Sequence, residues 1–101
     1  MKIGVVMPYY NEEEVLAHTI TQLTSLIDKL VKNGVIDAES KIWAVDDGSS
    51  DNTWKLLEEL ARTNSYVSGI KLSRNRGHQK ALLAGLLTAD GDALISIDAY
   101  L

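Results

Sequence analysis

Two kinds of segment alternate along this chain: short runs of β-branched residues, and longer stretches with an apolar residue every three or four positions. The short runs are typical of buried parallel strands, and the longer stretches are typical of amphipathic helices. Strands are expected at residues 2–7, 41–46, 66–72 and 93–98, and helices at about 13–32, 52–63 and 78–88.

Strands that alternate with helices pair in parallel, because each helix carries the chain back to the start of the next strand through a right-handed crossover. We therefore predict an α/β fold with a doubly wound, mainly parallel sheet and helices on both faces. The apolar stripe between Leu16 and Leu30 should cover one face, and Asn33 and Gly34 should end that helix. Without an internal repeat or linker, residues 1–101 are expected to form one unit.

Composition and charge narrow the class of protein. The 101 residues are 46% hydrophobic and 24% charged, which is enough apolar content for a buried core. A formal net charge of −4 and the lack of a long basic run argue against a nucleic-acid surface. The absence of cysteine excludes disulfides and thiolate metal sites. The apolar run at residues 1–7 is far below the ~20 residues of a membrane span, so none is expected in this segment.

Polar residues gather where the predicted strands end. The three segments are residues 8–14 (PYYNEEE), 45–51 (VDDGSSD) and 97–101 (IDAYL). Ligands of open α/β sheets bind beyond the carboxyl ends of the strands. The three segments therefore predict a single site at one edge of the sheet.

The segment VDDGSSD allows two interpretations. After a strand, one carboxylate of Asp46 and Asp47 can accept hydrogen bonds from a base or ribose, while its neighbour caps the next helix. Alternatively, these residues serve the turn alone, because turns select Asp, Gly and Ser for backbone reasons. The spacing from Asp47 to Glu58 also resembles a calcium-binding EF-hand loop, but Asn52 stands where that loop requires glycine.

A basic cluster surrounds the start of the predicted third helix, where free backbone N–H groups and the helix dipole favour anions. Its members are Arg74, Arg76, His78 and Lys80. A phosphate site is one interpretation. A solvated basic turn is the other, since the region has neither the P-loop nor the dinucleotide-binding glycine pattern.

The chain is similar to the N-terminal half of family-two glycosyltransferases, which have the GT-A nucleotide-sugar fold. Four strings carry the resemblance in this order and spacing: PYYNEEE, VDDGSSDNT, LSRNRGHQKALLAGL and GDALISIDAYL. The third string is most similar to bacterial polyprenyl-phosphate and dolichol-phosphate glycosyltransferases. The resemblance implies an inverting enzyme that transfers a sugar from a UDP- or GDP-sugar to an acceptor, for example a polyprenyl phosphate.

The resemblance also implies roles for residues in the first two polar segments. It places Pro8, Tyr10 and Glu12 around the nucleoside of the donor. It assigns the contact with the base to Asp46, and gives Asp47 a supporting role in the same loop. Residues 8–12 would then lie beside Asp98 at one crevice, because the first and fourth strands are neighbours in the GT-A fold.

At the donor diphosphate, the resemblance implies contacts from Arg76 and Lys80. Asp98 matches the first acidic residue of the DXD motif, which binds Mg²⁺ or Mn²⁺. Tyr100 stands where the family usually has the second Asp, and a phenol with a pKa near ~10 is a poor ligand. Three outcomes stay open: Asp98 holds the ion alone, the metal position is altered, or metal binding is lost.

The resemblance covers nearly the whole chain but only the donor half of the fold, so the chain looks truncated. No catalytic residue is assigned, because the general base is expected beyond Leu101, and negligible turnover is expected from residues 1–101 alone. Uncovered apolar surface should favour self-association. We expect a cytoplasmic location, at the cytoplasmic face of a membrane for the complete protein.

Two other functions are compatible with parts of the pattern. A non-catalytic nucleotide-binding module of the same fold is not excluded by fold alone. A response-regulator-like phosphoacceptor domain has a similar architecture, but it requires an acidic pair after the first strand and an Asp after the third. This chain has MPYYN and KLSRN at those places.

Overall fold

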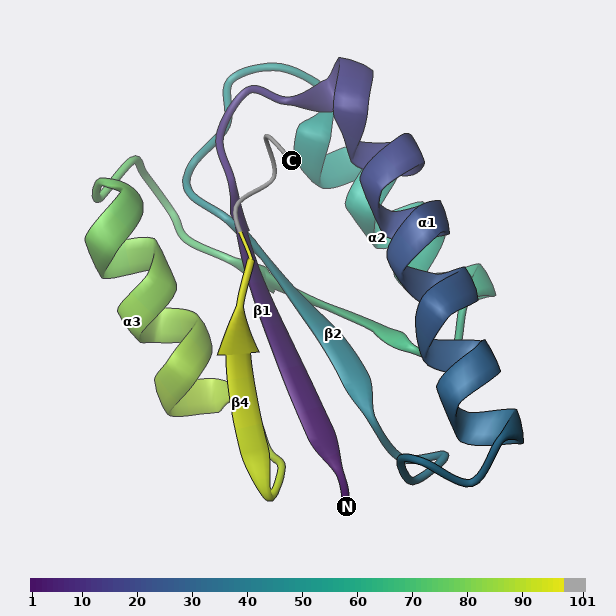
Figure 1. The fold of residues 1–101 in the computed structure, drawn as a ribbon. Helices are drawn as coiled ribbons and strands as arrows, with labels where there is room; N and C mark the ends of the chain where they lie inside the picture. The colour runs from purple at the N-terminus through teal and green to yellow at the C-terminus, as the bar shows by residue number, and fades with distance from the viewer. Residues whose placement is uncertain (98–101) are drawn as a thin grey trace.

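The computed structural model describes residues 1–97 and shows one parallel sheet with helices on both faces (Figure 1). The strands are β1 (Ile3–Tyr9), β2 (Lys41–Asp46), β3 (Val67–Lys71) and β4 (Ala93–Ser96), in the order β3-β2-β1-β4. The helices are α1 (Glu13–Lys32), α2 (Thr53–Thr63) and α3 (His78–Thr88). The predicted α/β class and the predicted order of elements are confirmed.

Strand β1 lies in the middle of the sheet and fixes where the strand ends meet. It pairs with β2 from Gly4 opposite Lys41 to Tyr9 opposite Asp46. It also pairs with β4, up to Val6 opposite Ser96, which confirms that the first and fourth strands are neighbours. The carboxyl ends of β1 and β2 therefore open at one edge of the sheet.

Strand β1 was expected to stop before Pro8, but it continues to Tyr9. The carbonyl of Tyr9 accepts a hydrogen bond from the N–H of Asp47 at 2.8 Å, so the polar backbone of Tyr9 faces β2 and that of Pro8 faces β4. Because β4 ends at Ser96, opposite Val6, Pro8 lies beyond this ladder and its missing N–H removes no bond from it.

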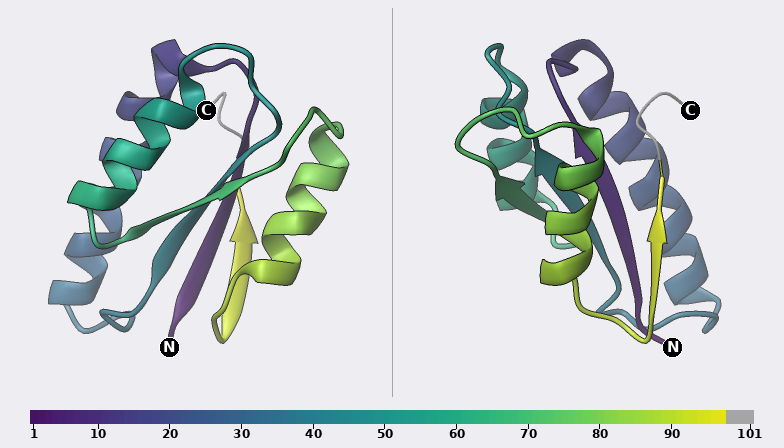
Figure 2. Two further views of the ribbon diagram at one scale, coloured as in Figure 1. Left: turned by 180° about the vertical axis from the view of Figure 1, so that it is seen from behind. Right: turned by 90° about the vertical axis from the view of Figure 1, so that its left-hand side faces the viewer.

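Helices α1 and α2 cover one face of the sheet, and α3 covers the other (Figure 2). On the α1 stripe, Leu16, Ile20 and Ile27 are buried as predicted. Helix α3 lies directly on the strands at Gly85, where an added Cβ would be 2.4 Å from Cγ1 of Val6. The absence of a side chain at this position therefore sets how closely α3 approaches the sheet.

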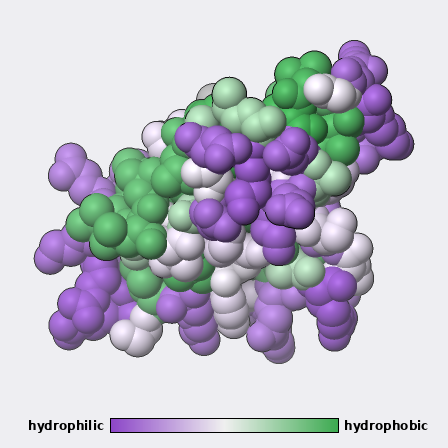
Figure 3. Space-filling model, turned by 90° about the horizontal axis from the view of Figure 1, so that it is seen from below, coloured by the Kyte–Doolittle hydropathy of each residue, from purple (hydrophilic) through white to green (hydrophobic). Residues whose placement is uncertain are grey.

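Hydrophobic surface remains exposed on part of the molecule (Figure 3). On the edge strand β4, Leu94 and Ile95 are 39% and 47% exposed, and on α3 Leu83 and Leu87 are also exposed. Among the helices of residues 1–97, none is both long and apolar enough to cross a membrane.

Candidate functional site

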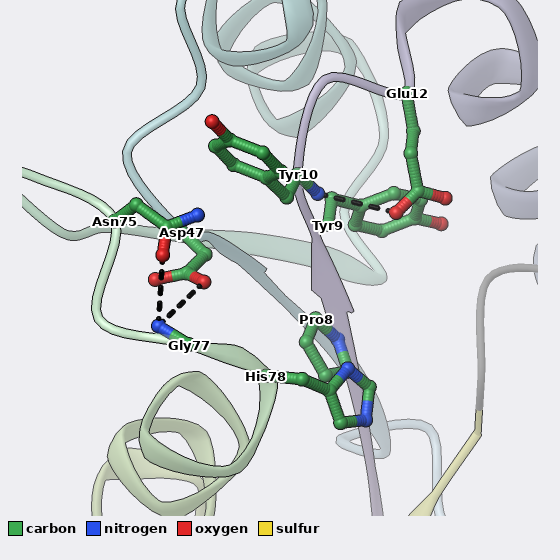
Figure 4. A pocket seen from close by; sticks show the side chains of 8 residues that line it. All are labelled: Pro8, Tyr9, Tyr10, Glu12, Asp47, Asn75, Gly77 and His78. Atoms are coloured by element: carbon green, nitrogen blue, oxygen red, sulfur yellow. Dashed lines mark hydrogen bonds between the residues drawn. The ribbon is translucent and has the colours of Figure 1, made fainter.

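A cavity of about 240 Å³ lies at the carboxyl ends of β1 and β2, beside the start of α3 (Figure 4). Three loops that are distant in sequence meet there: those after β1, β2 and β3. The lining residues are Pro8, Tyr9, Tyr10, Glu12, Asp47, Asn75, Gly77 and His78. The predicted edge of the sheet thus carries a cavity with both apolar and polar residues on its wall.

Half of the predicted site residues lie on the wall of this cavity. They are Pro8, Tyr10, Glu12 and Asp47. The others predicted among the described residues, Asp46, Arg76 and Lys80, are not part of the wall. Asp98 lies outside the described residues.

The sequence interpretation missed four wall residues, although each lies in a quoted string. Tyr9 belongs to PYYNEEE, and Asn75, Gly77 and His78 belong to LSRNRGH. His78 was noted as basic, but a single histidine gives too weak a signal for a role. In the structure it extends from the first residue of α3 toward Pro8 (Figure 4).

The Asp47 carboxylate faces the cavity and holds the start of α3. One oxygen, Oδ1, accepts a hydrogen bond from the N–H of Arg76 at 2.7 Å, and Oδ2 accepts one from Gly77 at 3.1 Å. The expectation that one of the paired carboxylates caps the next helix, α2, is wrong. The backbone N–H of Thr53, at the start of α2, donates instead to Asp51 Oδ1 at 2.9 Å.

The neighbouring Asp46 is fully buried. Its Oδ1 accepts a hydrogen bond from the hydroxyl of Ser49, and its Oδ2 has no hydrogen-bond partner among the described residues. The same Ser49 hydroxyl oxygen accepts a hydrogen bond from the N–H of Asn11 at 2.9 Å. Asp46 is therefore linked through Ser49 to the loop between β1 and α1. Because Asp46 is buried and does not line the cavity, its side chain could contact a ligand there only after a rearrangement.

The loops after β1 and β2 are joined by further hydrogen bonds. Asn11, at φ 49°, accepts one from the N–H of Ser50 at 2.8 Å and one from that of Asp51 at 3.3 Å. The N–H of Glu12 donates to the hydroxyl of Thr53 at 3.0 Å. The turn interpretation thus holds for the residues of VDDGSSD after Gly48, while Asp47 belongs to the cavity.

Two ionisable groups, one in β1 and one in the loop after β2, have altered pKa values. Burial raises the pKa of Tyr9 to about 12, which the charge of Glu12 reinforces and a 2.7 Å hydrogen bond with Thr19 opposes. For Asp51, burial alone would raise the pKa, but hydrogen bonds from the Thr53 hydroxyl and from backbone N–H groups lower it overall. At neutral pH, Tyr9 is therefore a neutral phenol and Asp51 a charged acceptor.

The basic cluster is exposed to solvent beside the cavity. Within residues 1–97, none of its side chains forms an ion pair. Free cations at a helix start favour an anionic ligand, because the helix dipole adds to their charge. The members of this cluster are Arg74, Arg76, His78 and Lys80.

The structure leaves the metal prediction untested. Between Met1 and Ile97, no three Asp, Glu or His side chains are grouped so that they could hold a metal ion. Asp98 and Tyr100, on which the prediction depends, lie outside the described residues.

A cavity at the carboxyl ends of the parallel strands, with the Asp47 carboxylate on its wall, is the place where open α/β sheets bind their ligands. The family model of Glycosyl transferase family 2 matches residues 4–99, so this chain belongs to glycosyl transferase family 2. The resemblance seen in the four strings is confirmed, and the response-regulator alternative is excluded.

Two relatives illustrate the match in sequence. The chain is 50% identical over 101 residues to the "Uncharacterized glycosyltransferase YkoT" of Bacillus subtilis, with 98% of this chain and 30% of that protein covered. It is 42% identical over 102 residues to the "Undecaprenyl-phosphate 4-deoxy-4-formamido-L-arabinose transferase" of Proteus mirabilis, with 99% and 29% covered. The chain thus spans about a third of the length of these relatives.

Solved structures confirm the GT-A fold. S. aureus TarS 1-349 in complex with UDP-GlcNAc superposes with a TM-score of 0.76 at 25% identity, covering 98% of this chain and 26% of that one. The mannosyltransferase PcManGT of Pyrobaculum calidifontis, in complex with GDP-Man and Mn²⁺, gives a TM-score of 0.74 at 22% identity. In that case 97% of this chain and 27% of the other are covered.

Proposed function

We propose that this chain is the nucleotide-sugar-binding part of an inverting glycosyltransferase that takes a sugar from a UDP- or GDP-sugar. The observation that carries the proposal is one cavity lined by Tyr10, Glu12 and Asp47, with unpaired cations at the adjoining helix start. Family membership supports the reaction class. The UDP-GlcNAc bound to TarS supports the class of donor.

In this proposal the nucleoside end of the donor occupies the cavity. A volume of about 240 Å³ is below the roughly 300–1,000 Å³ of complete ligand pockets, so it suits the base and ribose rather than the whole donor. Each oxygen of the Asp47 carboxylate uses one hydrogen bond in the protein and keeps acceptor capacity for an N–H of a base. We therefore give the contact with the base to Asp47 rather than to the buried Asp46, with Pro8 and Tyr10 forming the adjoining wall.

The diphosphate of the donor would then lie over the start of α3. Arg76 and Lys80 supply positive charge there, His78 supplies an imidazole that can donate a hydrogen bond, and the exposed first turn of the helix supplies free N–H groups. Each cation lacks an ion-pair partner within residues 1–97, so a phosphate would displace water only. Charge-assisted hydrogen bonds of this kind are the stronger ones in proteins.

We also propose that the complete enzyme uses Mg²⁺ or Mn²⁺, held by Asp98. A carboxylate is a hard oxygen donor of the type that both ions prefer, and the Mn²⁺ bound to PcManGT supports the assignment. When bound, such an ion neutralises the charge that develops on the leaving nucleoside diphosphate. Tyr100 supplies no second carboxylate, so most of the remaining ligands would be water and donor phosphate.

A polyprenyl phosphate is the proposed acceptor, at the cytoplasmic face of a membrane. The support is the name of the Proteus mirabilis relative, which includes undecaprenyl phosphate. The general base that deprotonates the acceptor is proposed to lie outside residues 1–101, since this chain covers about a third of that relative. Residues 1–97 are assigned only to binding of the donor.

Calorimetric titration of the chain with UDP and with GDP, with and without Mn²⁺, tests the donor site. One nucleotide should bind, and Asp47→Asn should weaken binding about tenfold or more, because hydrogen bonds to charged groups contribute roughly 1.5–3 kcal/mol. Asp37→Asn, the same change at an exposed position that pairs with the chain's first amine, is the control and should bind normally. Binding of neither nucleotide, in this chain or in a longer one that contains it, would refute the proposal.

We further propose that the isolated chain self-associates through the β4 edge. Leu94 and Ile95 expose apolar surface on an edge strand, and such edges pair with other chains unless they are covered or charged. Sedimentation over a concentration series should show association that Ile95→Lys reduces. A monomer at every concentration would contradict this proposal.

A further inference from the structure

The loops after β2 and β3 are locked together beside the cavity at two adjacent residues. At the first, the Asp47 carboxylate accepts hydrogen bonds from two successive backbone N–H groups, those of Arg76 and Gly77. At the second, the backbone of Gly48 packs against that of Arg74 and Asn75. We call this pair of contacts the Asp47–Gly48 joint.

The Gly48 contact leaves no space for any side chain. A Cβ at this position would lie 2.2 Å from the carbonyl carbon of Arg74 and 2.3 Å from the nitrogen of Asn75. These neighbours are backbone atoms, so a rotamer change cannot relieve the clash. Gly48 also has φ +69°, a backbone conformation that residues with a side chain rarely adopt. Any other residue must therefore push the loop after β3 away from the loop after β2.

The joint connects the two ends of the proposed donor site. Asp47 faces the cavity that suits a base, whereas Arg74 and Arg76 lie in the loop that the joint holds, and His78 begins the helix that follows. No ion pair within residues 1–97 fixes these side chains. Their positions relative to the cavity therefore depend on the backbone of residues 74–77, which the joint holds.

We propose that the Asp47–Gly48 joint couples recognition of the base to binding of the diphosphate. The inference rests on the proposed function and deepens it. Asp47 contacts the base directly and is in addition a positioning residue for the loop that meets the phosphates. Gly48 contacts no ligand and acts only through that loop.

Substitutions at positions 47 and 48 can separate contact with the base from positioning of the loop after β3. A carboxylate can accept from both N–H groups, but an amide has one acceptor oxygen and presents an NH₂ donor to the second. Asp47→Asn should thus weaken the contact with the base and also release one attachment of the loop. Gly48→Ala should displace the loop while the carboxylate remains in place.

Calorimetry with uridine, UMP and UDP, and with the guanosine series in parallel, measures the coupling. In the unaltered chain, affinity should rise with each phosphate. Gly48→Ala should reduce nucleoside affinity by about threefold at most, because Asn75 and Gly77 also line the cavity, and should reduce diphosphate affinity about tenfold further, the equivalent of roughly 1.4 kcal/mol. Asp47→Asn should weaken all three ligands, with a loss that grows from nucleoside to diphosphate.

Gly34→Ala is the matched control for Gly48→Ala. Gly34 has φ +72°, so its backbone strain on substitution is similar, but its Cβ would meet nothing within 4 Å. This variant should match Gly48→Ala in intrinsic strain and keep normal affinity for every ligand. Equal fold-losses for nucleoside and diphosphate in both joint variants would overturn the coupling and leave the donor site intact. No binding by the unaltered chain would overturn the donor site itself.

Amide hydrogen exchange tests the joint without any nucleotide. The N–H groups of Arg76 and Gly77 should be protected in the unaltered chain, and Asp47→Asn should increase exchange at one or both. Gly48→Ala should also increase it, whereas Gly34→Ala should not. Rapid exchange of both amides in the unaltered chain would overturn the inference.

Discussion

The two faces of the sheet are built differently. Among residues 1–97, the face under α1 and α2 buries a continuous cluster of ten hydrophobic residues, whereas the cluster under α3 has three buried residues. The smaller cluster consists of Val6, Val45 and Ala81, closed by the near approach of Gly85. The larger consists of Val5, Met7, Tyr9, Leu16, Ile20, Ile27, Ile42, Ala44, Leu57 and Val67.

This difference suggests that the face under α1 and α2 contributes mainly to folding, while the face under α3 contributes mainly to binding. The cavity lies at the α3 face, where Pro8, Asp47 and the start of α3 meet. Away from this cavity, the Ser49 hydroxyl donates a hydrogen bond to Asp46 and accepts one from the N–H of Asn11, which joins the loops after β1 and β2. A well-packed face can hold strand ends rigidly, and a sparsely packed one can admit a ligand. We therefore expect substitutions under α1 and α2 to change folding, and substitutions beside α3 to change binding more than folding.

The largest effect is expected for Leu57→Ala. Leu57 is fully buried between α2 and the sheet, and truncating such a side chain costs about 2–5 kcal/mol because a cavity remains. Leu82 on α3 is only partly buried, so Leu82→Ala should reduce the unfolding free energy clearly less than Leu57→Ala. Urea denaturation of both variants measures the difference. Equal losses of unfolding free energy would show that the two faces contribute alike.

The next effect is overpacking at the α3 face. In Gly85→Val, the new Cβ would lie 2.4 Å from Cγ1 of Val6 and 2.9 Å from Cγ2 of Val45, which should cost about 1–3 kcal/mol. Because the clash involves methyl groups of buried valine side chains, Val6→Ala should offset part of it. In a double-mutant cycle, the loss of unfolding free energy in the double variant should be smaller than the sum of the losses in the two single variants. Strict additivity would argue against direct packing of α3 on Val6.

A smaller effect is expected from acid. The pKa of Asp51 in the folded chain is below its ordinary value of 3.8, so the charged form is favoured by folding. Its contribution to stability is therefore present above that value and is lost as the pH falls through the lowered pKa. Asp51→Asn should make the decline in stability below about pH 4 less steep. Denaturation at several pH values, with exposed Asp37→Asn as the control, measures it; identical slopes would contradict the role of Asp51.

The smallest effect is expected for Leu87→Ala. Leu87 is 78% exposed on α3, and a substitution at such a position usually changes stability by less than about 0.5 kcal/mol. The same urea experiment should therefore find unfolding close to that of the unaltered chain. A loss comparable with that of Leu57→Ala would mean that another part of the molecule covers this residue in solution.

The elements and the family could be predicted from the sequence because their signals are local. The three- and four-residue spacing along α1 gave its position, and Gly34 marked its end. The extent of β1 could not be predicted in this way. Whether Pro8 is tolerated in β1 depends on where β4 ends, and this pairing joins residues about ninety positions apart in the sequence.

The structure brings part of the predicted residue set together at one cavity, and the roles of these residues in binding stay predictions. Pro8, Tyr10 and Glu12 line the cavity, and of the paired aspartates Asp47 lines it whereas Asp46 does not. Successive residues at a strand end point to opposite faces, so the sequence shows that Asp46 and Asp47 diverge without showing which face holds the cavity. The crossovers that place α1 and α2 opposite α3 decide this.

By itself the sequence determined the alternation of strands and helices, the resulting parallel sheet and membership of glycosyl transferase family 2. Only the tertiary structure decided that Asp47 holds the start of α3 and that Gly48 touches the backbone of Arg74. Periodicity and turn preference act within a few residues, whereas these contacts join loops more than twenty positions apart. Their geometry exists only after the sheet has brought those loops to one edge.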